Sequence, residues 1–311
     1  MGSDHFADRL MAEIRRKKSQ VVVGLDPRMA MMPHDILDGV DRSPHGAAAA
    51  ILRFNEGVID AVAESAVAVK CQIAFYERFG CEGLRAYAQT IRAARERDLI
   101  VIGDVKRNDI GSTAEAYADA HLPSAESGEW GAADDFHADA ITINPLFGSD
   151  GIEPFLERAR ITGSGLFALV KTSNPSSGEI QDLPCPEQKL YERIGSLVHS
   201  WGVADVGESG YGLLGAVVGA TYPEELTRMR ELMPHTIFLV PGFGAQGGGV
   251  KDVLGAFDEE GMGAVVNSSR GIIYSFRREP RAETYGVENW QQAVRDAAEQ
   301  MRREIWEATR T

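Results

Sequence analysis

The amino-acid sequence predicts an α/β protein of the (β/α)8, or TIM, barrel class, with one domain over residues 1–311, an N-terminal cap helix and long loops after the third and fifth strands. Three observations predict this class. Short apolar runs rich in β-branched residues recur eight times, most of them are apolar on both faces, and helical patterns alternate with them. The length also allows two domains of about 150 residues, and a doubly wound open sheet is the alternative fold.

Each expected strand is a short apolar run between helical stretches. In chain order the runs cover residues 21–26, 66–72, 99–106, 140–145, 165–172, 215–221, 236–243 and 263–270. Runs that are apolar on both faces are typical of parallel strands buried between a barrel interior and its helices. No charge block or low-complexity linker divides the chain, so one domain is expected.

Helices are expected between the strands from the spacing of apolar residues and from capping patterns. Residues 51–63 and 84–97 carry apolar residues three and four positions apart. A Ser-x-x-Glu pattern at 112–115 and a Thr-x-x-Glu pattern at 221–224 have the form of capping boxes, which predicts a helix start at each.

The N-terminal segment predicts a helix that caps the barrel. Phe6, Leu10, Met11 and Ile14 have helical spacing among charged residues, which favours an amphipathic helix over a signal peptide. The longest apolar stretches are far shorter than the roughly 18 residues of a membrane span, so no membrane association is expected.

Two connections are long and partly polar, residues 117–135 after the third strand and 173–214 after the fifth. Long loops that follow barrel strands usually carry function or cover a site. The alternative for each is a tolerated surface insertion.

Charge and cysteine content narrow the class of partner and the compartment. The 32 Lys and Arg residues against 46 Asp and Glu residues give a net charge of −14, which disfavours nonspecific binding to nucleic acid. A small anionic substrate in a local basic pocket remains compatible with it. Cys71, Cys81 and Cys185 form no CxxC pair, so a reducing cytoplasm is expected.

Polar residues stand where many of the expected strands end. Because the carboxyl ends of barrel strands meet at one mouth, these side chains are expected to converge there. They are Asp26, Lys70, Asp104, Lys106, Asn144, Thr172, Ser173, Asn174, Ser269 and Arg270.

Strand alternation refines this prediction. Side chains two positions apart share a face, so Asp104 and Lys106 point inward with the isoleucines before them, and Lys70 and Asp26 can meet them from adjacent strands. Asp109 follows in a loop and could point across to a neighbour. The alternative for Asp104 and Lys106 is a plain ion pair along one strand, but a buried lysine is uncommon unless it is paired or functional.

The ends of the last two expected strands predict a phosphate site. A glycine-rich segment follows Pro241, and Ser-Ser-Arg-Gly occupies 268–271. Glycines let backbone N–H groups approach an anion, and the arginine fork matches phosphate oxygens. Neither a Walker motif nor a complete dinucleotide fingerprint is present, and a flexible turn is the alternative.

Other chemistries have weaker support. The histidines lack the spacing of metal ligands, so no metal site is expected, and no Gly-x-Ser-x-Gly elbow is present. Lys171 on the fifth expected strand is the candidate for a Schiff base of the kind found in some barrel aldolases.

The motifs resemble those of the orotidine 5′-phosphate decarboxylase family. Residues 104–111 carry its D-x-K-x-x-D signature, and the flanking segments agree in order and strand position over residues 21–274. The chain length and a Thr-Ser-Asn-Pro segment at 172–175 are most similar to the larger bacterial, type 2, branch. The agreeing segments are Gly24-Leu25-Asp26-Pro27, Val69-Lys70, Thr172-Ser173-Asn174-Pro175, Pro241-Gly242-x-Gly244-x-Gln246-Gly247-Gly248 and Ser269-Arg270-Gly271.

This resemblance implies a role for each matching residue. Lys70, Asp104, Lys106 and Asp109 would form a charged tetrad, with Lys106 as proton donor and Asp109 reaching into the site of a partner subunit. The implied substrate contacts are Asp26 and Thr113 to ribose hydroxyls, Ser173 to the pyrimidine, and Gln246 and Arg270 to the phosphate, with Asn144, Pro241 and Ser269 completing the expected site. Family members often have glycine where this chain has Ser269.

The implied activity is decarboxylation of orotidine 5′-phosphate to uridine 5′-phosphate in pyrimidine synthesis by a cytoplasmic homodimer. The partner is a small nucleotide, with no nucleic acid and no membrane, and neither a metal nor an organic cofactor is expected. A magnesium-dependent sugar-phosphate decarboxylase, the Lys171 aldolase and an inert nucleotide-binding protein remain the alternatives.

Overall fold

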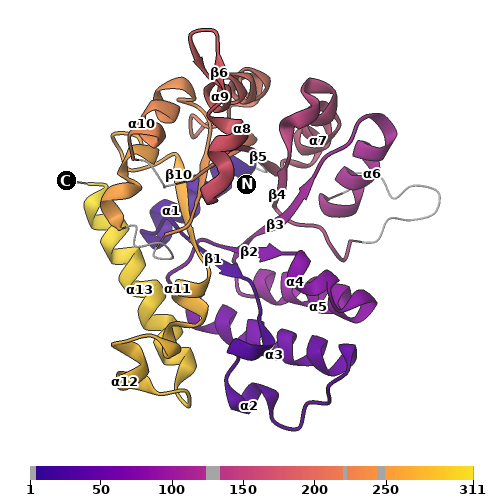
Figure 1. The fold of residues 1–311 in the computed structure, drawn as a ribbon, viewed down its shortest axis with the longest axis vertical. Coiled ribbons are helices and arrows are strands. Elements are labelled where there is room, and N and C mark those ends of the chain that lie inside the picture. Colours follow the sequence, from indigo (N-terminus) through magenta and orange to yellow (C-terminus); the bar gives the residue numbers. More distant parts are fainter. Residues whose placement is uncertain (1–4, 124–133, 220–222, 244–248, 311) are drawn as a thin grey trace.

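A closed barrel of eight parallel strands forms the centre of the protein (Figure 1). The computed structural model describes residues 5–123, 134–219, 223–243 and 249–310. Around the barrel the strand order is β1-β10-β9-β8-β5-β4-β3-β2. The strands are β1 (Val21–Leu25), β2 (Ala68–Gln72), β3 (Ile100–Arg107), β4 (Ala140–Ile143), β5 (Gly165–Lys171), β8 (Leu214–Val218), β9 (Phe238–Pro241) and β10 (Ala264–Ser268).

All eight strands lie within the expected runs or within one residue of them, and the barrel prediction is confirmed. The first strand pairs with the last in parallel, with Val21 opposite Val266, so the sheet closes on itself. This closure excludes the open doubly wound sheet, in which two edge strands would stay unpaired.

Helices surround the barrel and cover the outer faces of its strands (Figure 1). Burial of the strands on both faces explains why each reads as a continuous apolar run. The helices are α1 (Phe6–Lys17), α2 (His34–Leu37), α3 (Pro44–Val62), α4 (Ala74–Glu77), α5 (Gly80–Arg95), α6 (Gly111–His121), α7 (Ser149–Thr162), α8 (Gly178–Gln181), α9 (Leu190–Gly202), α10 (Pro223–Leu232), α11 (Arg270–Ile273), α12 (Arg281–Tyr285) and α13 (Trp290–Ala308).

The starts of the helices expected at 51–63 and after Ser112 differ from the prediction. The helix expected at 51–63 begins earlier, at Pro44, because the Ser43 side chain accepts a hydrogen bond from Gly46 and caps it. In α6 the cap position is Ile110, so Ser112 lies inside the helix and the capping box expected there is wrong. The box expected at 221–224 includes Thr221, which lies outside the described residues.

The two long connections contain more regular structure than expected. Helix α6 occupies 111–121, so the first connection is helical at its start, and 124–133 lie outside the described residues. The second connection holds α8, α9 and a small antiparallel hairpin of β6 (Pro184–Cys185) and β7 (Gln188–Lys189). Two-residue strands are too short to show a periodic pattern, which is why the sequence does not predict the hairpin.

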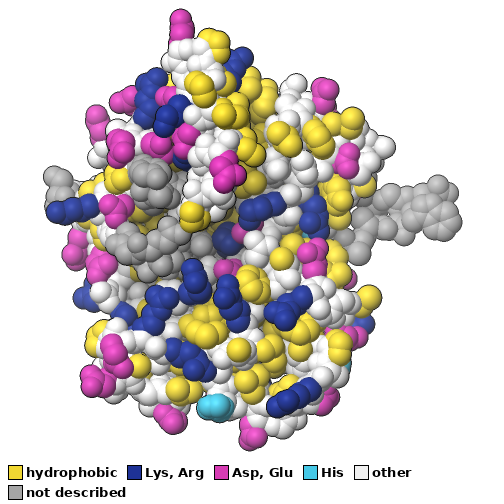
Figure 2. Space-filling model, viewed as in Figure 1, with side chains coloured by type: hydrophobic (Ala, Val, Ile, Leu, Met, Phe, Trp, Pro, Cys, Tyr) yellow, Lys and Arg dark blue, Asp and Glu magenta, His cyan; other side chains and the backbone are white. Residues whose placement is uncertain are grey.

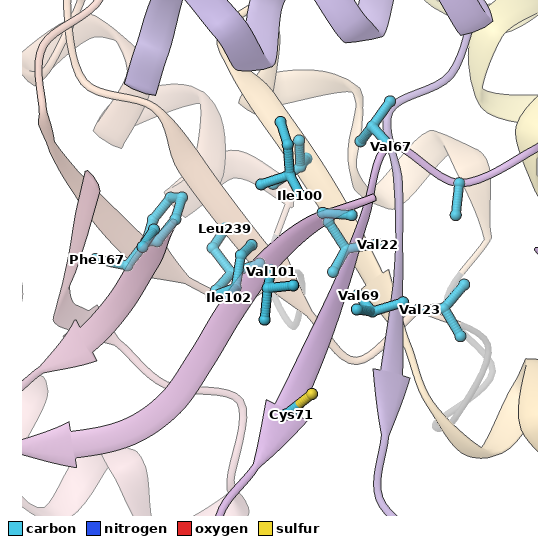
Figure 3. Close-up of a cluster of buried hydrophobic side chains, with 14 of the residues drawn as sticks. Val22, Val23, Val67, Val69, Cys71, Ile100, Val101, Ile102, Phe167 and Leu239 are labelled. Carbon is cyan, nitrogen blue, oxygen red and sulfur yellow. The ribbon is translucent and has the colours of Figure 1, made fainter. Parts of the chain in front are cut away.

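The core is continuous from the barrel interior to the inner faces of the helices. Figure 3 shows part of it, where Val22, Ile100, Ile102 and Leu239 lie among the strands with other buried side chains. Within the described residues, no helix is long and apolar enough to cross a membrane.

The helix α1 covers the amino-terminal end of the barrel, as the sequence predicts. Its Phe6 ring meets the Phe167 ring edge-on at 5.9 Å between centroids. A β-carbon at Gly165 would lie 2.2 Å from the Phe6 ring, so only glycine at the start of β5 leaves room for it. Because α1 closes the amino-terminal end of the barrel, a ligand cavity is expected at the carboxyl ends of the strands.

Candidate active site

A cavity of about 370 Å³ opens at the carboxyl ends of the barrel strands. Figure 2 views this face and shows basic and acidic side chains together near its centre. Many of the residues singled out from the sequence line the cavity, among them Asp26, Lys70, Asp104, Lys106, Thr172, Ser173, Asn174, Pro241, Ser269 and Arg270.

Asp104 is the centre of the charged group at the mouth. Its Oδ2 accepts a hydrogen bond from Lys70 Nζ at 2.8 Å, and its Oδ1 accepts one from Lys106 Nζ at 2.5 Å. The Thr142 hydroxyl donates to the same Oδ1 at 2.9 Å. Lys70 and Asp104 are buried, whereas the side chain of Lys106 is 46% exposed and reaches the open cavity.

Burial and mutual attraction act in opposite directions on these groups. Burial by itself would lower the pKa of Lys70, but the charges of Asp104 and Asp26 outweigh it and raise that pKa. Burial by itself would raise the pKa of Asp104, but the two ammonium groups outweigh it and lower that pKa. Both groups are therefore charged at neutral pH.

Lys106 reaches the cavity through an irregularity in β3 rather than through regular strand alternation. The pairing of β3 with β4 shifts register between Gly103 and Arg107, and Lys106 has a φ of +46°. Its backbone N–H donates to Thr142 Oγ1 at 3.0 Å instead of to a strand carbonyl. A residue with a side chain rarely adopts this conformation, and such positions cluster at functional sites.

Asp26 brings a second carboxylate to the cavity. It lies at the end of β1, where Gly24 is paired with Lys70 of β2. Its Oδ1 is buried and has no hydrogen-bond partner among the described residues. A buried acceptor without a partner costs free energy, so this oxygen fits a ligand hydroxyl that would donate to it.

The segment after β5 forms another wall of the cavity. Thr172, Ser173 and Asn174 line it. Gln181 of α8 holds Thr172 in place, since its side chain accepts from the Thr172 backbone at 2.9 Å and donates to the Thr172 hydroxyl at 2.7 Å. Ser173, the next residue along the chain, lines the same cavity as the charged group.

Lys171 points away from the cavity. Its Nζ lies 2.7 Å from Asp182 and 3.6 Å from Glu225, and it stands 4.7 Å from the centroid of the Tyr191 ring. The side chain is 3% exposed and does not line the cavity. A Schiff-base lysine must reach its substrate, so the aldolase hypothesis has no support in this geometry.

The neighbouring wall carries the expected phosphate residues, since a β-carbon at Gly242 would lie 3.8 Å from Ser173 Oγ. Pro241, Gly242, Ser269 and Arg270 line it, and Gln246 lies outside the described residues. A β-carbon at Gly24 would stand 1.9 Å from Ser269 Oγ, so the glycine of β1 makes room for this serine. Arg270 is exposed at the mouth with its guanidinium available to an anion.

Three predicted residues do not line this cavity. The Asp109 carboxylate accepts from the next backbone N–H, that of Ile110, at 2.9 Å. Thr113 is exposed on α6, and the Asn144 side chain caps the turn after β4 by accepting from Leu146 N at 3.1 Å. Within one subunit the structure therefore does not bring these residues to the charged group.

Sequence reasoning missed several cavity residues that lie inside strands or next to them. Thr142 and Asn267 are polar residues inside otherwise apolar strands, whereas the polar residues that predict the site stand mainly where the strands end. Both have inward parity, which was the available signal. Phe75 on α4 and Gln72 of β2 also line the cavity.

The described structure gives no support for a nucleophilic cysteine or a metal site. All three cysteines are free, and burial raises the pKa of the Cys71 thiol to about 12, so it stays protonated. Within the described residues, no group of three or more His, Cys, Asp or Glu side chains is placed to hold a metal ion.

The whole sequence is similar to a known protein family and to named members of it. The model of the orotidine 5′-phosphate decarboxylase / HUMPS family matches residues 19–285. A protein named orotidine 5′-phosphate decarboxylase from Rhodopirellula baltica is 46% identical over 303 residues, covering 96% of this chain and 98% of its own length. A protein of the same name from Clostridium novyi is 38% identical over 299 residues, covering 96% and 97% of the two chains.

Solved structures show the same similarity. The structure of Leishmania donovani OMP decarboxylase covers 98% of this chain and 99% of its own, with a TM-score of 0.74 and 32% sequence identity. A Plasmodium berghei orotidine 5′-monophosphate decarboxylase at 17% identity has a TM-score of 0.71 and is similar in fold.

Proposed function

This chain belongs to the orotidine 5′-phosphate decarboxylase / HUMPS family, and we propose that the cavity at the barrel mouth is its active site. The enzyme decarboxylates orotidine 5′-phosphate and is a carboxy-lyase. The observation that carries the assignment of the site is Asp104 held between two ammonium groups in the same cavity as Arg270. We also propose that the whole chain acts as one barrel domain in the cytoplasm.

The chemistry is difficult because loss of CO2 leaves an electron pair on C6 of the pyrimidine with little resonance to stabilise it. In the proposed reaction the bond from C6 to the carboxylate breaks, CO2 departs, and the ammonium of Lys106 gives its proton to C6. A fixed cation beside C6 interacts more strongly with the carbanion than with the ground state, which lowers the barrier.

Asp104 and Lys70 are proposed to hold Lys106 in position. The hydrogen bond from Lys106 Nζ to Asp104 Oδ1 fixes the Lys106 amine. The Lys70 ammonium donates a hydrogen bond to Oδ2 of the same carboxylate. Repulsion between Asp104 and the substrate carboxylate is a second way in which this geometry could act, but ground-state stress of that kind is contested as a source of rate.

The substrate is proposed to lie across the cavity from Asp26 to Arg270. Asp26 has an unpartnered buried oxygen for a ribose hydroxyl, and Ser173 faces the proposed position of the pyrimidine. Arg270, with Ser269, Pro241 and Gln246 around it, is proposed to take the phosphate. Asn144 stays a proposed contact of the substrate, although it does not reach this cavity in one subunit.

The active unit is proposed to be a homodimer in which Asp109 and Thr113 reach the partner's site. Large apolar side chains are exposed around Asp109, with Ile110 at 55%, Leu146 at 78% and Phe147 at 51%. Asp109 and Phe147 both flank Gly151, so these residues form one patch. An apolar patch of this kind next to a charged loop supports an interface with a second copy of the chain.

The ultraviolet spectrum of orotidine 5′-phosphate gives the direct test. With the purified enzyme the substrate absorbance should fall with time as uridine 5′-phosphate forms, and addition of a chelator should leave the rate unchanged. A protein that binds uridine 5′-phosphate but leaves the spectrum constant would instead be the inert nucleotide-binding alternative. Loss of activity with a chelator, restored by magnesium, would favour the metal-dependent decarboxylase.

A further inference from the structure

A second cavity, of about 310 Å³, adjoins the active site. It is lined by Arg28, Met31, Arg270, Tyr274, Arg277 and Arg278. Arg270 also lines the active-site cavity, so the two spaces meet at this side chain. Figure 2 shows Lys and Arg side chains gathered on this part of the surface, in the region where Figure 1 places α11.

The cavity is strongly basic in a chain that is acidic as a whole. Four of its six lining residues are arginines and none is acidic, while the net charge of the chain is −14. Across the described residues, these four arginines form no ion pair with a carboxylate, in contrast to Arg160, which pairs with both Glu153 and Asp205. Like charges gathered in one cavity repel each other, and an anion between them would remove that repulsion.

Neutral groups hold the Arg277 guanidinium and the Arg28 backbone in position without neutralising the charges. The Arg277 guanidinium donates to the carbonyl oxygens of Met31 and Met32 at 2.9 and 3.0 Å. The buried Tyr274 hydroxyl accepts from the backbone N–H of Arg28 at 2.6 Å and donates to the carbonyl of Asp26 at 3.3 Å. The cavity is thereby tied to the end of β1, next to the active site.

The side chain of Arg28 stacks on an aromatic ring that lines the active-site cavity. Its guanidinium carbon lies 5.5 Å from the centroid of the Phe75 ring, and Phe75 lines the active-site cavity. Such stacking on a ring leaves the edge of a guanidinium free to donate hydrogen bonds. Arg28 and Arg277 are therefore held in place with N–H donors still available.

We propose that this cavity binds a second phosphate group beside the one that Arg270 takes in the active site. The inference rests on the proposed function, because Arg270 is assigned to the substrate phosphate there. Two sources share this chemistry: the β-phosphate of a nucleoside 5′-diphosphate, and free inorganic phosphate bound beside a nucleoside monophosphate. Guanidinium forks match phosphate oxygens in pairs, so either source fits the arrangement.

Inhibition of the decarboxylase reaction tests the proposal. Uridine 5′-diphosphate should inhibit wild-type enzyme competitively with an inhibition constant at least about fivefold below that of uridine 5′-monophosphate. Arg278→Gln should bring the two constants together while it leaves KM for orotidine 5′-phosphate within about twofold. Arg295→Gln, an exposed arginine on α13 with the same change of charge, should behave like wild type.

Calorimetry separates the two sources. Inorganic phosphate is titrated into enzyme saturated with uridine 5′-monophosphate, and binding that disappears in Arg278→Gln identifies free phosphate as the ligand. A preference for the diphosphate without such binding identifies the nucleotide. The proposal is overturned if neither signal is seen, or if Arg295→Gln reduces them as much as Arg278→Gln does. Failure of the proposed function is seen separately, as wild-type enzyme that does not turn over orotidine 5′-phosphate.

Discussion

At the scale of single residues, the arrangement around Asp104 combines two roles. Its carboxylate links the buried Lys70 to the half-exposed Lys106, so one ammonium belongs to the core and the other to the cavity. Thr142 fixes Asp104 and Lys106 together, since its hydroxyl donates to the Asp104 carboxylate and accepts from the backbone N–H of Lys106. In the proposed mechanism Lys106 is the acid, and the remaining groups hold it in position.

Replacing Lys106 tests its role as the acid. We expect Lys106→Ala to reduce kcat by a factor on the order of a thousand or more, because both the proton and the charge beside C6 are lost. The fold should survive, since this side chain is the exposed member of the group. Steady-state kinetics with circular dichroism as a control for folding measures both effects, and an unchanged rate would remove Lys106 from the mechanism.

Replacing Asp104 tests the electrostatics through stability. Asp104→Asn leaves Lys70 buried without its partner charge, so the free energy of unfolding at pH 7 should fall by about 3–5 kcal/mol. The folded state lowers the pKa of Asp104, so its contribution is present above the unfolded value of about 3.9 and is lost as the pH falls below it. The raised pKa of Lys70 keeps its contribution complete up to about pH 10.

Urea unfolding at pH 7 and pH 3 measures this difference. The gap in unfolding free energy between wild type and Asp104→Asn should be smaller at pH 3. Asp60→Asn is a matched control, because Asp60 pairs with Arg97 on the surface, and it should change the free energy by less than about 1 kcal/mol. An equal gap at both pH values would contradict the expected ionisation of Asp104.

At the scale of elements, the two ends of the barrel have separate tasks. Helix α1 closes the amino-terminal end with apolar side chains, while the carboxyl ends of the strands and the segments after them form the site. Glycines mark the closest contacts at both ends, Gly165 under Phe6 and Gly24 beside Ser269. Stability and chemistry should therefore respond to different substitutions, as is common in barrels of this class.

A change in α1 should affect stability alone. Phe6 is buried and packs on Phe167. Phe6→Ala should lower the free energy of unfolding by about 3–5 kcal/mol, because it leaves a cavity at the closed end of the barrel. KM and kcat of the enzyme that remains folded should match wild type. Urea unfolding and kinetics on one preparation compare the two, and a stable but inactive variant would contradict the separation.

At the scale of the whole molecule, the barrel could be predicted from the sequence because its strands are apolar on both faces. Strand alternation and position at the barrel mouth correctly predict that Lys70 and Asp104 line the cavity; Lys106 also lines it, but through the irregularity in β3. The irregularity opposite Thr142 could not be found in this way, because it depends on how β3 pairs with β4 and not on either strand alone. The proposed roles of Asp109 and Thr113 likewise require a second subunit, since one subunit does not bring these residues to the charged group.

Mixed dimers test the proposed contribution of Asp109. Asp109→Ala and Lys106→Ala should each be inactive, but a mixed dimer holds one site with both native residues. Mixing the variants under conditions of subunit exchange should therefore recover up to about a quarter of wild-type activity, from the statistics of random pairing. Activity of the mixture measured against time, with exchange shown by differently tagged subunits, makes the comparison. Full exchange without recovery would contradict a shared site.

The positive φ of Lys106 bears on how this enzyme could be made more heat-resistant. Glycine adopts that backbone conformation without steric cost, whereas a residue with a side chain is destabilised there by roughly 1–3 kcal/mol. Lys106→Gly should thus melt at a higher temperature than Lys106→Ala, and both should be inactive. A directed-evolution screen that rewards only thermal tolerance would accept the glycine and discard catalysis, so any such screen of this enzyme needs selection for activity at the same time.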